Sequence, residues 1–227
     1  MQESFDKYID NYRIDQDKAV ALSGESSAFF AAYKTQKMMK WFEDLIAEPI
    51  SILDFGCGDG LMTNFVKEAF WKARVVGVDS SEKSIEVAEN NYPAIDFYKT
   101  NDTRLNFPDA IFDLVFAAGV FHHIPFEQHE AHLQEIIRVL KPGGFFILFE
   151  LNTLNPLTVR TFKRNPIDQD ARMMHFWYSK KLLSSHGNAK TIFYCFFPKI
   201  LSFLRRLEPY LIWLPVGALY ASIVKKK

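Results

Sequence analysis

The alternation of short apolar segments with longer amphipathic segments constrains the fold of this chain more than any other feature. Strand-like runs occur at 50–55, 74–78, 95–99, 112–117 and 145–150, and helix-like segments between them at 61–71, 82–90 and 127–140. Apolar strands separated by amphipathic helices are typical of parallel strands that are joined by right-handed crossovers and covered on both faces. The pattern therefore predicts an α/β, doubly wound fold.

The two ends of the chain predict additions to this core. Residues 1–48 carry apolar side chains at helical spacing, most clearly from Phe29 to Leu45, and Pro49 ends the run. After residue 150 the pattern loosens, with an irregular stretch at 152–174, a helix-like segment at 179–185, and strand-like runs at 191–197 and 218–224. We expect a single domain with an N-terminal helical cap at 1–48, a cofactor-binding core at 49–150, and a substrate lid with the last strands at 151–227.

Charge and cysteine content narrow the class of protein. The chain has 27 Lys plus Arg and 27 Asp plus Glu, so no net charge draws it to a polyanion, and nucleic acid is not an expected partner. Its first residues are polar and acidic, unlike a signal peptide. Cys57 and Cys195 lie in different contexts without metal-ligand spacing. We expect a cytoplasmic protein with no disulfide and no metal site.

The segment "ILDFGCGDG" at 52–60 predicts a ligand site. In an open parallel sheet, ligands bind beyond the carboxyl ends of the strands, and glycines let backbone approach them closely. A dinucleotide site would have the spacing G-x-G-x-x-G, whereas this turn has G-x-G-x-G with Asp54 and Asp59 where phosphates would lie. The turn therefore disfavours a nicotinamide oxidoreductase and favours a ligand that carries positive charge.

A second acid indicates what else that ligand contains. Asp79 ends the strand-like run "VVGVDSS", about 20 residues after Gly60, the spacing at which a carboxylate accepts hydrogen bonds from ribose hydroxyls. The expected ligand has a ribose and lacks a pyrophosphate.

These pieces together resemble the class I S-adenosylmethionine-dependent methyltransferases. The matching segments, in order, are "ILDFGCGDG", "VVGVDSS", "ND" at 101–102, "FDLVFAAGVFHHI" from Phe112, and "IIRVLKPGGFFILFE" from Ile136. The resemblance implies a mostly parallel seven-stranded sheet of order 3-2-1-4-5-7-6, in which the last-inserted strand is antiparallel. It also implies S-adenosyl-L-methionine as the cofactor.

By the same resemblance, Gly56 and Gly58 lie against the methionine portion, Asp79 holds the ribose, and the backbone at Ala117 and Ala118 meets the amino group. Relatives commonly read D-A-E-x-L-P-F where this chain has "NDTRLNF", so Asn101, Asp102 and Thr103 are alternative adenine contacts. Tyr12 and Lys34 are candidates for the methionine carboxylate or for a lid. The expected cofactor-binding residues are thus Asp54, Gly56, Cys57, Gly58, Asp79, Ser80, Asn101, Asp102, Thr103, Ala117, Ala118, Tyr12 and Lys34.

The expected reaction is methyl transfer to a small-molecule acceptor by in-line displacement. His122 and His123 follow the fourth strand-like run and are candidate bases, although a histidine there can also bond backbone and shape the pocket. The alternative function is a non-catalytic S-adenosylmethionine-binding module that acts through protein partners.

The acceptor is expected to depend on residues after the shared core. The segment at 152–177 carries a mixture of side chains able to clamp an anionic or sugar-bearing acceptor, and a saccharide or a lipid-linked compound is a candidate. These side chains are Asn155, Arg160, Arg164, Arg172, His175 and Trp177. The apolar segment "PKILSFLRRLEPYLIWLP" at 198–215 has three interpretations: peripheral membrane or lipid-linked contact, internal packing over the sheet edge, or a homodimer interface.

Overall fold

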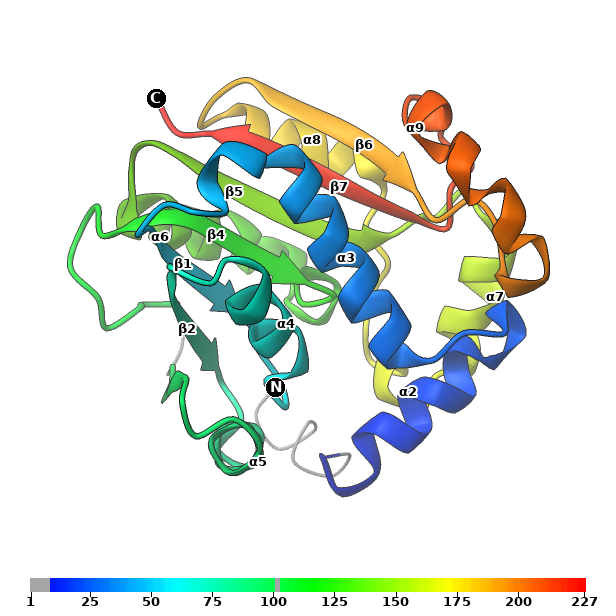
Figure 1. Ribbon diagram of the computed structural model, residues 1–227, viewed down its shortest axis with the longest axis horizontal. Coiled ribbons are helices and arrows are strands. Elements are labelled where there is room, and N and C mark those ends of the chain that lie inside the picture. The colour runs from blue at the N-terminus through cyan, green and yellow to red at the C-terminus, as the bar shows by residue number, and fades with distance from the viewer. Residues whose placement is uncertain (1–8, 101–102) are drawn as a thin grey trace.

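The computed structural model describes residues 9–100 and 103–227, and a seven-stranded sheet forms its centre (Figure 1). The strand order is β3-β2-β1-β4-β5-β7-β6. Neighbouring strands pair in parallel from β3 to β5, and β7 runs antiparallel to both β5 and β6. The predicted fold class and strand order are therefore confirmed. The strands are β1 (Ser51–Phe55), β2 (Arg74–Asp79), β3 (Asp96–Lys99), β4 (Phe112–Ala118), β5 (Leu140–Leu151), β6 (Ala189–Tyr194) and β7 (Leu219–Lys225).

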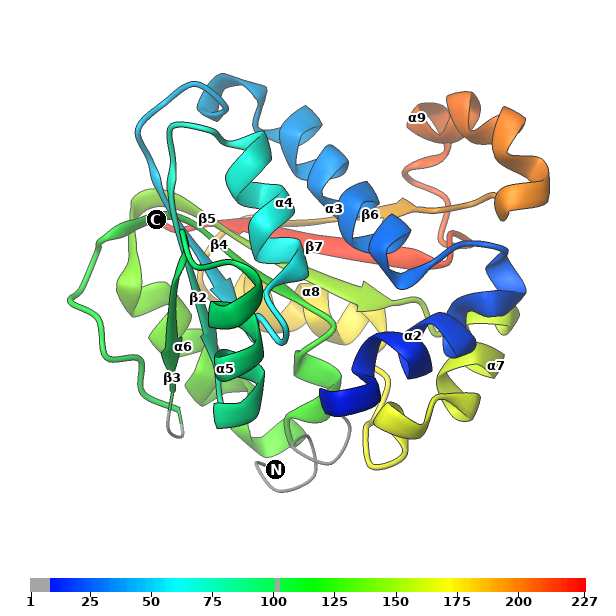
Figure 2. The ribbon, with the colours of Figure 1, turned by 60° about the horizontal axis from the view of Figure 1, so that its bottom comes forward.

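Helices cover both faces of the sheet (Figures 1 and 2). One face carries α3 (Ser27–Trp41), α4 (Leu61–Ala69) and α5 (Glu82–Asn91), and the other carries α6 (His129–Val139) and α8 (Phe176–Ser184). The hydroxyl oxygens of Ser26 and Ser81 accept backbone N–H groups at the starts of α3 and α5, so local sequence fixes where these helices begin.

The core is divided by the sheet into two main apolar layers. Adjacent residues of β1 point to opposite faces, so that Ile52 packs with α3 and α4 while Leu53 packs with α6 and α8. Both side chains are fully buried, which explains why this strand is a continuous apolar run rather than an alternating one.

The N-terminal region is a series of short helices that lies over the carboxyl ends of the strands. It consists of η1 (Ile9–Asn11), α2 (Tyr12–Val20) and η2 (Ala21–Ser23), after which Gly24 adopts a left-handed φ of 75° and redirects the chain into α3. Helix α2 packs against α7 (Pro156–Arg164) and η6 (Pro166–Asp168). Residues from both ends of the chain thus meet at one edge of the sheet.

Between β6 and β7 the chain forms η7 (Lys199–Leu207) and α9 (Glu208–Leu211), the orange segment in Figures 1 and 2. Its inner side is held to α3 by Glu208, which is 1% exposed. The carboxylate of Glu208 accepts hydrogen bonds from the Tyr33 hydroxyl and the Phe196 N–H, and pairs with Lys37 at 3.4 Å. Its outer side exposes Ile200, Leu201, Phe203, Leu207, Tyr210, Ile212, Trp213 and Val216. Internal packing therefore accounts for one side of this segment only.

We predict that Glu208→Gln lowers the free energy of unfolding by about 1 to 3 kcal/mol, because the amide leaves the ammonium of Lys37 without its buried countercharge. Urea denaturation followed by circular dichroism measures the effect. Glu89→Gln on the exposed face of α5 is the matched control and should change stability by less than about 0.5 kcal/mol. Equal stability of the two variants would show that Glu208 does not hold the segment in place.

Candidate functional site

A cavity of about 1240 Å³ opens at the carboxyl ends of β1, β2 and β4. Its walls include the glycine turn after β1, the residues that follow β2 and β4, and side chains from α2, α3 and η6. Parallel strands end at the same edge of a sheet, and the order of strands reverses between β1 and β4, so the cavity lies at the usual ligand position of a doubly wound fold.

The glycine turn forms one wall of this cavity, and its glycines have different reasons to be glycine. Gly56 has a φ of 80°, and a Cβ there would lie 2.4 Å from the side chain of Val120. Gly58 has a φ of 55°, and the nearest described atom to a Cβ would be the hydroxyl oxygen of Tyr12, 3.9 Å away. Gly56 is therefore required by packing of the protein on itself, whereas Gly58 leaves room on the cavity side.

Asp79 is held against the turn by backbone hydrogen bonds. Its Oδ2 accepts the N–H of Gly58 at 2.9 Å, and its Oδ1 accepts the N–H of Ser81 at 2.9 Å. These bonds fix the orientation of the carboxylate at the end of β2, where Asp79 and Ser80 both line the cavity. A carboxylate has further lone pairs for a ligand hydroxyl.

A second carboxyl group of the cavity wall, Asp54, is 2% exposed and accepts a hydrogen bond from Thr63 at 2.7 Å. Burial raises the pKa of Asp54 to about 7, and the negative charge of Asp79 adds to this shift. Burial also lowers the pKa of Lys34, which lines the same cavity. The wall therefore holds an acid whose charge is incompletely balanced, which favours a cationic ligand.

Helix α2 closes the side of the cavity next to the turn. Arg13 forms an ion pair with Asp59 of the turn, and Tyr12 lines the cavity beside it. Burial raises the pKa of the Tyr12 hydroxyl, which is consequently neutral and able to donate a hydrogen bond.

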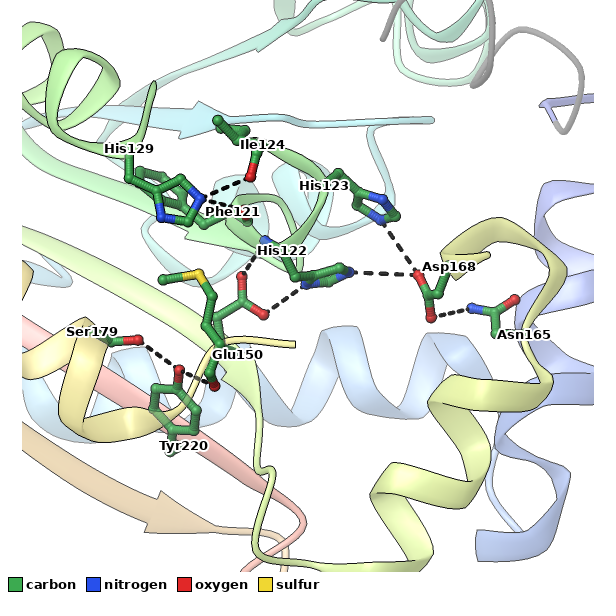
Figure 3. Close-up of polar contacts among 11 residues, drawn as sticks. Phe121, His122, His123, Ile124, His129, Glu150, Asn165, Asp168, Ser179 and Tyr220 are labelled. Carbon is green, nitrogen blue, oxygen red and sulfur yellow. Dashed lines mark hydrogen bonds and ion pairs between the residues drawn. The ribbon is translucent and has the colours of Figure 1, made fainter. Parts of the chain in front are cut away.

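Two adjacent histidines and Asp168 form the polar end of the cavity, and Glu150 lies behind His122 (Figure 3). His122 and His123 belong to η4 (Phe121–His123), and His122 is 5% exposed. The Nδ1 atom of His122 lies 2.7 Å from Oε2 of Glu150, on β5. Oδ1 of Asp168, on η6, lies 3.5 Å from Nε2 of His122 and 3.4 Å from Nε2 of His123. Asn165 donates a hydrogen bond to Oδ2 of Asp168 at 2.7 Å.

The two histidines differ in charge in the ligand-free protein. Burial opposes the charged form of His122, but the carboxylates of Glu150 and Asp168 outweigh it and raise the pKa to about 10. Burial and the neighbouring charge on His122 lower the pKa of His123 to about 3. His123 is therefore neutral near pH 7.

The structure brings most residues singled out from the sequence to the cavity. Asn101 and Asp102 lie outside the described residues. Ala117 is fully buried in the core and is not part of the cavity wall, whereas its neighbour Ala118 is. The predicted residues that line the cavity are Tyr12, Lys34, Asp54, Gly56, Cys57, Gly58, Asp79, Ser80, Thr103, Ala118, His122 and His123. Burial raises the pKa of Cys57, so its thiol is a packing group rather than a nucleophile.

Sequence reasoning missed Arg13, Glu150, Asn165 and Asp168. It emphasised the cations of the segment at 152–174, but that segment contributes Thr161, Phe162, Asn165 and Asp168 to the cavity wall instead of Arg160, Arg164 or Arg172. Only Glu150 carried a usable signal, because it is an acid at the end of an apolar strand.

Comparison with known proteins gives related sequences for the core of the chain. The model of the family described as methyltransferase domain matches residues 52–144. Trans-aconitate 2-methyltransferase of Azoarcus sp. is 32% identical over 54% of this chain and 47% of its own length. Sterol 24-C-methyltransferase of Aspergillus fumigatus is 36% identical over 46% of this chain and 29% of its own length. The chain thus matches less than half the length of these relatives.

Solved structures match almost the whole chain in fold. A methyltransferase of Thermotoga maritima, described as a possible histamine N-methyltransferase, has a TM-score of 0.70 at 18% identity and covers 100% of both chains. A methyltransferase of Archaeoglobus fulgidus has a TM-score of 0.69 at 18% identity and covers 88% of this chain and 95% of its own. Residues 52–144 thus match the methyltransferase-domain family, and the sheet order of the chain is the one that the resemblance to class I S-adenosylmethionine-dependent methyltransferases implies.

Proposed function

We propose that this protein transfers a methyl group from S-adenosyl-L-methionine to a small-molecule acceptor bound in the same cavity. The observation that carries the proposal is one cavity with two chemically distinct ends. One end has a bare glycine turn and two carboxyl groups, and the other has a histidine and acid cluster.

The residues at the first end fit the cofactor. Gly58 leaves space for a ligand against the backbone, and Asp79 is oriented to accept ribose hydroxyls. The partly uncompensated charge of Asp54 suits a ligand that carries an ammonium and a sulfonium group. When bound, the cofactor supplies an electrophilic methyl group on sulfur.

The second end suits an acceptor with a polar atom. The methyl group passes to the acceptor in an in-line displacement, and alignment in an enclosed site contributes up to about 7 to 11 kcal/mol to such reactions. His123, neutral and at the cavity wall, is positioned to accept a hydrogen bond from the acceptor. His122 is held by Glu150 and is better suited to positioning than to accepting a proton.

The cavity volume favours an enzyme over a non-catalytic cofactor-binding module. Small-molecule pockets typically enclose about 300 to 1,000 Å³. At about 1240 Å³ the cavity exceeds this range and has room for a cofactor and an acceptor together.

We further propose that the acceptor is amphiphilic, such as a lipid-linked compound, and that the protein meets it at a membrane surface. No helix in the described part of the chain is long and apolar enough to cross a membrane. The outer side of the segment at 198–216 nevertheless exposes aromatic and aliphatic side chains together with Lys199 and Arg206, and its one acid, Glu208, is buried. Aromatic anchors beside cations are typical of elements that bind anionic lipid interfaces. Among the relatives, the fatty-acid O-methyltransferase of Mycolicibacterium smegmatis acts on a lipid by its name.

Gly58→Ala tests the cofactor end of the site. The substitution should weaken binding of S-adenosylhomocysteine at least tenfold, because the methyl group of the new alanine points into the cavity. It should also lower the free energy of unfolding by about 1 kcal/mol, because alanine is strained at positive φ. Gly143→Ala is the matched control: it has a φ of 79°, lies outside the cavity and should show the stability loss alone. Calorimetric titration of both variants decides, and equal affinities would refute the proposed placement.

The pKa of Asp54 gives a pH prediction. Positive charge in the cavity favours the ionised carboxyl, so cofactor binding lowers this pKa and releases a proton below about pH 7. Affinity for S-adenosylmethionine should therefore rise with pH, by up to about tenfold per unit, and level off above about pH 7. Asp54→Asn should remove the slope. If the affinity of Asp54→Asn still rose with pH as in the wild type, the pH dependence would belong to another titrating group.

Flotation with liposomes tests the membrane proposal. The wild-type protein should float with vesicles that contain anionic lipid, and Phe203→Ser with Trp213→Ser should abolish flotation without changing affinity for S-adenosylhomocysteine. Trp71→Ser, an exposed tryptophan elsewhere on the surface, is the control and should float like the wild type. Membrane contact would be contradicted if the wild-type protein did not float and eluted as a dimer while the double variant eluted as a monomer. That result would favour a homodimer.

A further inference from the structure

We propose that His122, His123 and Asp168 bind a divalent transition-metal ion such as Zn²⁺ at the polar end of the cavity. One donor atom from each residue lies within 4.8 Å of the others, and in Figure 3 the three side chains converge from η4 and η6. Two imidazole nitrogens and one carboxylate oxygen form a donor set common to zinc and non-haem iron sites. The sequence did not predict a metal site, because Asp168 lies far from the two histidines along the chain.

The spacing of the donor atoms fits coordination better than hydrogen bonding. Oδ1 of Asp168 lies 3.5 Å from Nε2 of His122 and 3.4 Å from Nε2 of His123. Good hydrogen bonds of this kind are about 2.7 to 3.2 Å long. Zinc binds such atoms at about 2.0 to 2.2 Å, which places two ligand atoms of a tetrahedral ion about 3.4 Å apart. Two of the three donor–donor distances thus match the spacing of ligands around one ion, and the third lies within 4.8 Å.

Neighbouring groups orient each ligand for this role. Glu150 lies 2.7 Å from Nδ1 of His122, which directs the other ring nitrogen, Nε2, toward Asp168. Asn165 donates to Oδ2 of Asp168 and leaves Oδ1 facing both histidines. A carboxylate behind a ligating histidine and a hydrogen bond to a ligating carboxylate are the usual supports of a metal site.

The backbone around these residues is also fixed. The N–H of Arg172 donates to the carbonyl of His122 at 2.8 Å, and the N–H of His122 donates to Oε1 of Glu150 at 3.3 Å. Two histidines that are adjacent in sequence are therefore held with both rings at the cavity wall rather than on opposite sides of η4.

Three protein ligands leave one position of a tetrahedral ion open. Sites with three protein ligands and an open position are typical of zinc that acts on a bound molecule, whereas structural zinc has four protein ligands. Since all three ligands line the cavity, the open position faces the bound molecule. With Nε2 of His123 on the ion, the ion replaces that imidazole in contacting an oxygen or nitrogen atom of the acceptor, a role that rests on the proposed methyl transfer. The metal site itself does not.

The competing arrangement is an ion-pair cluster in which a protonated His122 bridges Glu150 and Asp168 without a metal. It requires the same residues but predicts no metal affinity. Direct metal binding to the 227-residue protein therefore separates the two arrangements.

The experiment is a calorimetric titration of chelator-treated protein with Zn²⁺, repeated with Mn²⁺ and Mg²⁺. Wild-type protein should bind one Zn²⁺ per chain, more tightly than Mg²⁺. Asp168→Asn and His123→Ala should each weaken binding at least tenfold, and Glu150→Gln, which alters only the support of His122, should weaken it by about 10- to 100-fold. Circular dichroism confirms that each variant is folded.

His186→Ala is the matched control, because His186 forms an ion pair with Glu130 at 3.2 Å on the surface, away from the cavity. It should leave Zn²⁺ affinity unchanged. Absence of stoichiometric Zn²⁺ binding, or equal affinity in wild type, Asp168→Asn and His123→Ala, would overturn the metal site. Titration of the same wild-type sample with S-adenosylhomocysteine keeps the two proposals separate, because binding of that ligand without Zn²⁺ would leave the proposed function standing.

Discussion

The contact on which the rest of the site depends is the pair of backbone hydrogen bonds that hold Asp79 between the glycine turn and the start of α5. Oδ2 of Asp79 accepts the N–H of Gly58, and Oδ1 accepts the N–H of Ser81. This arrangement requires the turn to run close to the end of β2, where the N–H groups of Gly56 and Cys57 donate hydrogen bonds to the carbonyl of Val78 at 2.8 and 2.9 Å. Parallel pairing of β1 with β2 brings the two segments to the same edge. The register of the sheet, the course of the glycine turn and the orientation of the Asp79 carboxylate therefore depend on one another.

Electrostatics divide the cavity into two ends. At the turn, Asp54 is buried with an incomplete countercharge, so its pKa rises and the wall favours a cation. At the far end, the carboxylates of Glu150 and Asp168 lie on either side of His122. Both ends are therefore suited to positively charged species, which is the common basis for placing a sulfonium cofactor at one end and a metal ion at the other.

Local signals made the fold and the turn predictable, whereas the far end of the cavity depends on long-range packing. Each buried parallel strand is an apolar run, which made the strands recognisable in the sequence, whereas the strand order followed from the family resemblance. The strand expected at 191–197 ends at Tyr194, because Cys195 adopts a left-handed φ of 60° that breaks the extended chain. Asp168 sits in an irregular segment with no periodic pattern, and it reaches the histidines through long-range contacts, among them the packing of α2 against η6 and the hydrogen bond from Arg172 N–H to the carbonyl of His122. No spacing rule within the sequence encodes such a contact.

Calorimetry with S-adenosylhomocysteine and NAD on wild-type protein and Asp79→Asn tests the central claim most directly. The account predicts one S-adenosylhomocysteine site per chain, no NAD binding, and a loss of about 1 to 3 kcal/mol of binding free energy in Asp79→Asn, because ribose hydroxyls lose their charged acceptor. Binding of NAD in preference to S-adenosylhomocysteine, or unchanged affinity in Asp79→Asn, would contradict it.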